Sequence, residues 1–483
     1  MSRRLLLPAA CAGLLLAALP ASAQQPQPTE QPPAPGALRP FAVPPAREFR
    51  LPNGVRVVVV EKHTLPIVTG RVLIGAGSMY EPAEKNGLAS LTAQVLREGT
   101  RTLTGPQIAE RMEALGASFG TNAGFEFASA SVTAPKSTFA DAMELAASTV
   151  TSPAFTESEL LRVRGQMMAG AVRLNSTVEG LAGLAHNRAL FDSTTGYSRP
   201  VAGTAASLPR ITRDDAVAYH QRMYSPANTT VLLVGDVTQE EARRIAERAF
   251  ASWNVAGATA ASLPRPALRT ANGTRIILVD RPGSVQSGIR VGHAAVSATD
   301  PDLIPYTALS QVLGGGFRSR LMMSLRERHG WTYSAFSDLT ARPLSGTFLM
   351  ATSARTNATD SAVAEIVSQY RRIATEPVPA DELRAAAANV VGSFPSSIQT
   401  VQGLADRIQQ LLQNGQPLDY YNTYRERFSA VTPAEITRIA RTRLTPDALT
   451  IVVAGDLSKI EAPIRALNLG TVEVLDPTGA RVR

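Results

Sequence analysis

The sequence has almost no cysteine. The single cysteine of the 483 residues, Cys11, lies in an N-terminal segment. That segment, residues 1–23, combines two arginines, an apolar run over residues 5–19 and the small-residue sequence ASA, which together predict a cleaved signal peptide. A lipoprotein anchor at Cys11 is disfavoured because Pro8 stands where such anchors have an aliphatic residue. We therefore expect an exported, periplasmic protein without disulfides, cysteine metal ligands or a cysteine nucleophile.

Long apolar runs and blocks of basic residues are also missing. After residue 23, no segment is apolar over the roughly 20 residues that a membrane-spanning helix needs. The formal net charge is +8, but the 48 lysines and arginines are scattered among 40 acidic residues. Nucleic-acid binding requires a dense basic patch. We therefore interpret the charge as a solvated surface and expect neither a nucleic-acid partner nor a stable membrane span.

Histidine is scarce, and its spacing excludes a local metal site. Zinc-binding helices place two histidines about one helical turn apart, and no two of the histidines here lie within five residues of each other. We interpret each as an ordinary surface or hydrogen-bonded histidine, while a metal site assembled from distant histidines and acids stays open. The five histidines are His63, His186, His220, His293 and His329.

What the sequence does contain is an internal duplication. The stretch ITRDDAVAYHQRMYSPANTTVLLVGDV, residues 211–237, aligns without a gap with VTPAEITRIARTRLTPDALTIVVAGDL, residues 431–457. Each has a threonine followed by an acidic residue, as at a helix start, then a helical stretch, a proline turn and an apolar strand. Residues 155–170 and 378–393 form a second matching pair. A repeat of this length is a whole domain.

The duplication and the local composition predict the domain organisation. Within each repeat, hairpins accompany the helices, which indicates an α+β fold of two tandem homologous domains, each a mostly antiparallel sheet packed against helices, and not a doubly wound parallel sheet. The expected segments are the signal peptide 1–23, a Pro/Gln-rich linker 24–47, an N-terminal domain 48–255, an interdomain linker 256–273, a C-terminal domain 274–470 and a tail 471–483.

Several motifs resemble one peptidase family. GAGSMYEPAEKNGLASLTAQVLREGT near the start, LGGGFRSRLMMSLRERHGWTYSAFS from Leu313, and the strand motifs YSPANTTVLLVGDV and TPDALTIVVAGDL resemble the M16 (insulinase or pitrilysin) family of zinc metallopeptidases. The resemblance is to the type with two tandem domains and extends from about Phe49 to Leu469. In active members a helix carries H-x-x-E-H, whose two histidines bind zinc and whose glutamate activates the water.

At the positions of that motif, this chain has Ser90, Ala93 and Gln94. Serine and glutamine are weak neutral ligands, and alanine cannot accept a proton. The third zinc ligand of the family, a glutamate on a later helix, falls on Ala169 and Gly170. The resemblance therefore implies a member with a degenerate zinc site, without a cofactor of its own and inactive alone.

An arginine–tyrosine pair is retained. Arg326 and Tyr333, in LRERHGWTY, have the spacing of two residues that in the family hold the substrate carbonyl and stabilise the oxyanion. A permanently charged guanidinium and a phenol suit that role. The alternative is that Arg326 is a solvated helix residue and Tyr333 a core aromatic of a strand.

A possible peptide-binding edge comes from the same resemblance. The residues Asn122, Ala123, Gly124 and Phe125 fall where active relatives offer the edge of a sheet to an extended peptide. An exposed edge can pair with such a peptide through main-chain hydrogen bonds. The alternative is a sheet edge without a ligand.

The resulting functional expectation is a non-catalytic subunit of a heterodimeric M16 peptidase. An H-x-x-E-H-bearing partner subunit supplies zinc and the base, and this chain supplies Arg326, Tyr333 and half of a chamber for unfolded peptides. The alternative is a catalytically inactive homodimer that binds peptides or serves as a scaffold. A serine hydrolase is disfavoured because no G-x-S-x-G elbow precedes a helix.

Overall fold

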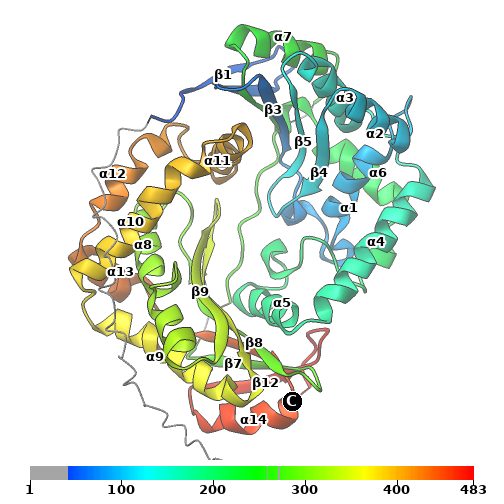
Figure 1. Ribbon diagram of the computed structural model, residues 1–483. Coiled ribbons are helices and arrows are strands. Elements are labelled where there is room, and N and C mark those ends of the chain that lie inside the picture. The colour runs from blue at the N-terminus through cyan, green and yellow to red at the C-terminus, as the bar shows by residue number, and fades with distance from the viewer. Residues whose placement is uncertain (1–41, 258, 270–271, 483) are drawn as a thin grey trace, which may run out of the picture. The chain divides into compact units, whose positions relative to one another are not determined.

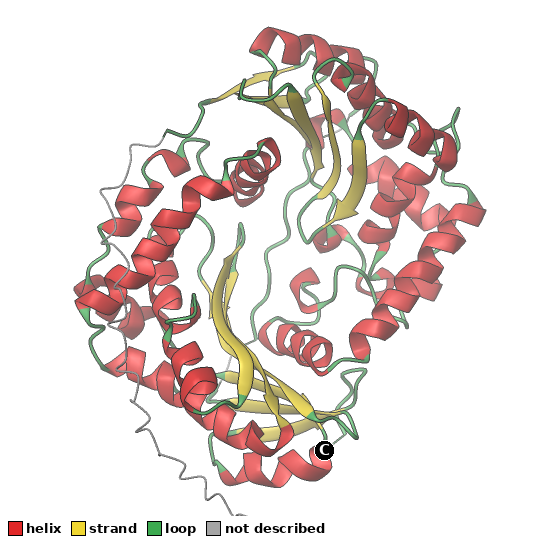
Figure 2. Cartoon of the chain, in the orientation of Figure 1, coloured by secondary structure: helices red, strands yellow, loops and turns green. Residues whose placement is uncertain are grey.

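A computed structural model describes residues 42–257, 259–269 and 272–482. The predicted signal peptide and most of the predicted linker 24–47 lie outside the described residues. Within them, two six-stranded sheets each pack against helices (Figures 1 and 2), so the expected α+β class is confirmed. No helix in the described part of the chain combines the length and the apolar character needed to cross a bilayer.

The first sheet has the strand order β1-β2-β6-β3-β5-β4. Apart from the parallel pair β2 and β6, its neighbouring strands are antiparallel. Its strands are β1 (Ala46–Arg50), β2 (Arg56–Glu61), β3 (Ile67–Ile74), β4 (Ser118–Ala123), β5 (Ala128–Pro135) and β6 (Thr229–Gly235).

The second sheet has the order β12-β7-β11-β8-β10-β9 and repeats the first. Its parallel pair β7 and β11 joins Arg275 to Thr450, just as β2 and β6 join Arg56 to Thr230. Its strands are β7 (Arg275–Asp280), β8 (Gln286–Ala295), β9 (Thr332–Ala341), β10 (Gly346–Arg355), β11 (Thr450–Gly455) and β12 (Thr471–Leu475).

The outer strand next to the parallel pair differs between the two sheets. In the first sheet it is β1, which runs antiparallel to β2, and in the second it is β12, which runs parallel to β7. The expected boundaries are wrong at both places: Ala46 and Arg47 belong to β1 and not to the linker, and residues 471–475 form a strand and not a tail. Each strand supplies main-chain partners that β2 and β7 would otherwise lack.

Helices cover one face of each sheet and form its main apolar core. The helix starts repeat as the sequence predicts: Thr212 and Thr432 are N-caps, each in a capping box with an acidic residue three positions on. On the first sheet these helices are α1 (Leu88–Val95), α2 (Gly105–Ala114), α3 (Phe139–Thr151), α4 (Glu157–Asn175), α6 (Arg213–Met223) and α7 (Gln239–Phe250). On the second they are α8 (Leu303–Gly314), α9 (Thr359–Thr375), α10 (Ala380–Ser397), α12 (Tyr424–Ser429), α13 (Pro433–Arg443) and α14 (Leu457–Ala466).

The opposite face of each sheet is covered by a helix from the other half of the chain. Leu404 and Ile408 of α11 (Val401–Asn414) pack on Val58 and Leu232 of the first sheet. Reciprocally, α5 (Val178–Leu190) packs on the second sheet, where Leu181 lies in one apolar cluster with strand residues of β7 and β11. Because side chains alternate between the faces of a strand, these central strands are apolar on both faces, as the run RVVVVE shows.

Candidate functional site

A buried carboxylate organises the start of α1. Glu81, which is 6% exposed, accepts hydrogen bonds from the backbone N–H groups of Gly87 at 2.9 Å and Ala89 at 2.8 Å. It also accepts one from the side-chain amide of Asn86 at 2.8 Å. Glu81 thus replaces an N-cap side chain for this helix. Burial outweighs these hydrogen bonds and raises the pKa of Glu81 to about 7.

The degenerate motif positions lie on α1 and satisfy one another. Gln94 donates a hydrogen bond from Nε2 to Ser90 Oγ at 3.1 Å, and Ala93 is fully buried. The neighbouring helix α4, which packs against α1, carries Ala169 and Gly170 and therefore no ligand at the third position. Zinc sites are built from imidazole, thiolate or carboxylate, so this donor set does not fit the zinc of the family. Over the ranges that the structure describes, no three His, Cys, Asp or Glu side chains are grouped to hold a metal ion.

Most histidines have identifiable partners. His63 Nδ1 lies 2.6 Å from Asp236, and His220 Nε2 lies 2.8 Å from the Val150 carbonyl oxygen. His186 departs from the expectation, because it is buried and its Nε2 finds no hydrogen-bond partner among the described residues. Burial lowers the pKa of His186 to about 3, so this imidazole stays neutral at physiological pH.

Arg326 lies in a π-helical turn, η7 (Met322–Arg328). The N–H of His329 donates to the carbonyl oxygen of Ser324, five residues earlier, at 3.2 Å. The turn buries Met322 and Leu325 and leaves the Arg326 side chain 31% exposed. Such turns are rare and occur frequently at functional sites.

Tyr333 lies in a β-bulge. Between the pairs Thr352–Ala335 and Ala354–Thr332, the two residues Tyr333 and Ser334 of β9 face one residue of β10. The bulge breaks the alternation of the strand, so that adjacent residues 333 and 334 are both exposed. Buried Thr352 fixes it, because its hydroxyl oxygen lies 2.8 Å from both Ser334 O and Thr332 Oγ1 and donates its one proton within this group.

The π turn and the bulge bring Arg326 and Tyr333 together. The guanidinium carbon of Arg326 lies 5.0 Å from the Tyr333 ring centroid and 5.7 Å from that of Phe317, which is cation–π distance. Tyr333 is 82% exposed and Phe317 75% exposed, so Tyr333 is not a core aromatic. The structure thus presents a cation and a phenol to solvent, the donor types that stabilise a developing oxyanion.

Sequence reasoning missed Phe317 and the bulge. Two features of the sequence could have indicated them. An aromatic residue directly follows three glycines, and hydroxyl residues occupy positions 332 and 334 of the strand.

The expected peptide-binding edge is only partly a strand. Asn122 and Ala123 end β4, the outermost strand of the first sheet, whereas Gly124 and Phe125 lie beyond its end. The carbonyl oxygens of Gly124 and Phe125 accept hydrogen bonds from backbone N–H groups of residues 78 and 79 at 3.0 and 2.8 Å. Because these carbonyl groups are already bonded, the available edge is confined to β4.

Two family models match the chain. Residues 56–190 match the model described as insulinase (peptidase family M16), and residues 210–390 match the model described as peptidase M16 inactive domain. The chain belongs to the M16 family. The first matched region lies within the first half of the duplication, whereas the second begins there, just before α6, and extends into the second half. Together they include the degenerate α1 positions and the Arg326–Tyr333 pair.

Individual M16 relatives carry different names. The non-peptidase homolog YmxG of Helicobacter pylori is 24% identical over 412 residues, 84% of this chain and 93% of that protein. An uncharacterized zinc protease of Mycobacterium leprae is 27% identical over 290 residues, 60% of this chain and 64% of that protein, so this match spans slightly less than two thirds of the relative.

Solved structures share the fold. A crystal structure described as the peptidase M16 inactive domain from Pseudomonas fluorescens has a TM-score of 0.79 and 26% identity, covering 85% of this chain and 98% of that one. A structure described as a protease from Helicobacter pylori has a TM-score of 0.79 and 21% identity, covering 85% of this chain and all of that one.

Proposed function

We propose that this chain is the non-catalytic subunit of a heterodimeric M16 metallopeptidase of the periplasm. A partner subunit with H-x-x-E-H holds the zinc and the base. In this chain, Arg326 and Tyr333 bind the peptide and stabilise the developing oxyanion. The chain also forms part of the wall of the peptide chamber. The substrates are unfolded peptides, which can align along β4 through main-chain hydrogen bonds.

The proposal rests on one difference: the zinc-ligand positions of the family have lost their chemistry in this chain, whereas the Arg326–Tyr333 pair is retained. Where zinc donors belong, Ser90 and Gln94 bond each other. The Arg326–Tyr333 pair, in contrast, is positioned by two irregular elements and faces solvent. Oxyanion donors promote hydrolysis where a nucleophile is activated, so in this proposal a partner chain with H-x-x-E-H would hold the zinc and supply the base. The match to the M16 inactive domain and the similarity to a non-peptidase homolog support this proposal.

Co-purification followed by peptide cleavage tests the proposal. The chain is co-expressed with an H-x-x-E-H M16 protein of the same organism, and cleavage of a quenched fluorescent peptide by the purified complex is followed. We expect Arg326→Ala and Tyr333→Phe each to lower kcat of the complex by about 100-fold, the usual effect of losing one oxyanion donor. Arg328→Ala is the matched control, because Arg328 is exposed on the same turn and should leave kcat unchanged.

Two results contradict the proposal. Chelator-sensitive cleavage by this chain alone places a metal site within it. An isolated homodimer that binds the peptide, together with a complex whose kcat is insensitive to both substitutions, supports the inactive peptide-binding or scaffold protein.

A further inference from the structure

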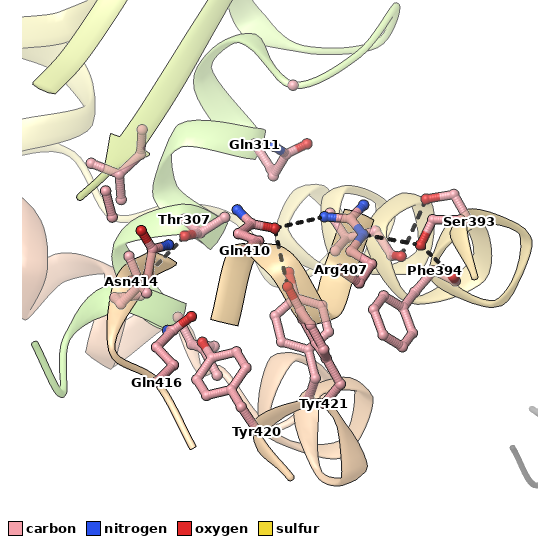
Figure 3. A pocket seen from close by; sticks show the side chains of 18 of the residues that line it. Thr307, Gln311, Ser393, Phe394, Arg407, Gln410, Asn414, Gln416, Tyr420 and Tyr421 are labelled. Atoms are coloured by element: carbon pink, nitrogen blue, oxygen red, sulfur yellow. Dashed lines mark hydrogen bonds between the residues drawn. The ribbon is translucent and has the colours of Figure 1, made fainter. Parts of the chain in front are cut away.

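A pocket in the C-terminal half has no part in the function proposed above. Its volume is about 400 Å³, and it is lined by residues of α8, α10, α11 and α12, of strand β9 and of the segment between α11 and α12 (Figure 3). Figure 3 shows the rings of Tyr420 and Tyr421 on the side opposite Gln311. Amide side chains supply most of the remaining polar lining, and none of the described residues that line the pocket is acidic. The amide residues are Gln311, Asn389, Gln410, Asn414 and Gln416.

The duplication relates this pocket to the degenerate zinc positions. The sequence AQVL at residues 93–96 of α1 recurs as SQVL at residues 310–313 of α8. Gln311 is therefore the counterpart of Gln94, and Thr307 that of Ser90. By the same repeat, Ser393 of α10 corresponds to Gly170 of α4. The three counterparts in the second half all line the pocket.

Arg407 places a positive charge in the pocket. Its Nε donates to Ser397 Oγ and its Nη1 to Gln410 Oε1, both at 3.3 Å. Gln410 is held in turn by the hydroxyl of Tyr421 at 3.1 Å. Both acceptors of the guanidinium are thus neutral oxygens, and both hydrogen bonds are longer than usual. An incoming carboxylate can replace them with shorter, charge-assisted bonds.

We infer that this pocket binds the carboxyl end of a short peptide. The guanidinium of Arg407 binds the terminal carboxylate, the amide side chains bind the peptide N–H and C=O groups, and the tyrosine rings contact an apolar or aromatic terminal side chain. A peptide matches this lining because its backbone alternates donors and acceptors, as the amide side chains do. The volume, within the usual range for ligand pockets, suits two or three residues.

Calorimetric titration of this chain alone tests the inference. The probe is N-acetyl-alanyl-phenylalanine, compared with the same dipeptide as its C-terminal amide. We expect the acid to bind and the amide to bind at least tenfold more weakly. Arg407→Gln should weaken binding of the acid at least tenfold. Arg384→Gln is the matched control, because Arg384 is exposed on α10 and does not line the pocket.

A second variant separates loss of the ligand from loss of the fold. Ser393→Trp fills the pocket from an exposed helix position, and should abolish binding without changing the thermal unfolding midpoint. Equal affinity for acid and amide, or binding that survives both Arg407→Gln and Ser393→Trp, overturns the inference. Binding of glucuronic acid in preference to the dipeptide overturns the peptide assignment. Since the titration needs no partner subunit, its outcome is independent of whether the heterodimer forms.

Discussion

Among the titratable residues near the degenerate zinc positions, Glu81 has the surroundings that differ most from bulk water. Its carboxylate is buried at the start of α1 and receives three hydrogen bonds. Even so, desolvation dominates and the pKa rises from 4.5 to about 7. The folded protein therefore binds the Glu81 proton more tightly than the unfolded chain does.

The free energy of unfolding should depend on pH through Glu81. Its stabilising contribution is complete below about pH 4.5, where both states are protonated, and is lost as the pH rises through about 7. Relative to Glu81→Gln, the wild-type chain should lose about 1–3 kcal/mol between pH 5 and pH 8. Urea unfolding of both proteins across that range measures the difference. Parallel profiles would show that Glu81 does not titrate there.

Glu81→Gln also carries a constant cost. The variant places an NH2 group, which accepts no hydrogen bond, where one of the two carboxyl oxygens accepts from Gly87 or Ala89, so it should be less stable at every pH. The test therefore uses the way in which the stability difference between the two proteins changes with pH, and not the size of that difference at a single pH.

The bulge in β9 and the π turn η7 together set the geometry of the Arg326–Tyr333 pair. Neither element is regular, and the buried hydroxyl of Thr352 bonds the bulge from the neighbouring strand. The position of Tyr333 thus depends on a residue on another strand.

Thr352→Val should loosen the bulge while preserving side-chain shape. The bulge loses the hydrogen bonds of the buried Thr352 hydroxyl, which should cost about 1 kcal/mol of unfolding free energy. In the complex, kcat should fall because Tyr333 is less well held. Thr347→Val, on β10 away from the bulge, is the control. Unchanged kcat in Thr352→Val would mean that the bulge does not position the phenol.

The side chains on α1 and α4 let us predict the zinc content of the protein and its response to a chelator. Because Ser90, Ala93, Ala169 and Gly170 provide no strong zinc ligand, the purified chain should contain far less than one zinc per molecule. Elemental analysis after gel filtration measures this content, and a chelator should leave the thermal unfolding midpoint unchanged. Stoichiometric zinc that a chelator removes with loss of stability would contradict the assignment.

The two halves of the molecule are joined by the exchange of α5 and α11. Each helix covers the second apolar face of the sheet formed by the other half. Without that helix, the sheet would expose apolar surface to water, which is energetically unfavourable. The stability of each half therefore depends on the other.

Leu181→Ala on α5 should destabilise both halves. Leu181 is 2% exposed, and leucine-to-alanine substitutions in cores cost about 2–5 kcal/mol. The chain has two tryptophans, Trp253 in the first core and Trp331 against the second, so Trp331→Phe and Trp253→Phe provide a probe of each half. Both probes should report a lower unfolding midpoint. Leu161→Ala, at a position 44% exposed, is the control, and a shift of one probe alone would show independent halves.

Local patterns predicted much of the fold. The helix starts at Thr212 and Thr432 and the apolar strands β6 and β11 of the duplicated stretches agree with the sequence interpretation, because caps and apolar runs act over a few residues. The strands β1 and β12 were missed because strand formation at a sheet edge depends on a partner far away in sequence.

The site was predictable in its chemistry and less so in its geometry. The spacing of Arg326 and Tyr333 was visible in the sequence, but the exposure of Tyr333 depends on a bulge defined by pairing with β10. Likewise, Gly124 and Phe125 gave no sign that their carbonyl groups bond residues 78 and 79.

The sequence by itself determined the duplication and the missing zinc donors, because the identity of a side chain fixes which ligand and proton chemistry is available. Only the tertiary structure decided three further features: the contact between Arg326 and Tyr333, the exchange of α5 and α11, and the lining of the pocket around Arg407. Each depends on residues that meet only after distant segments pack.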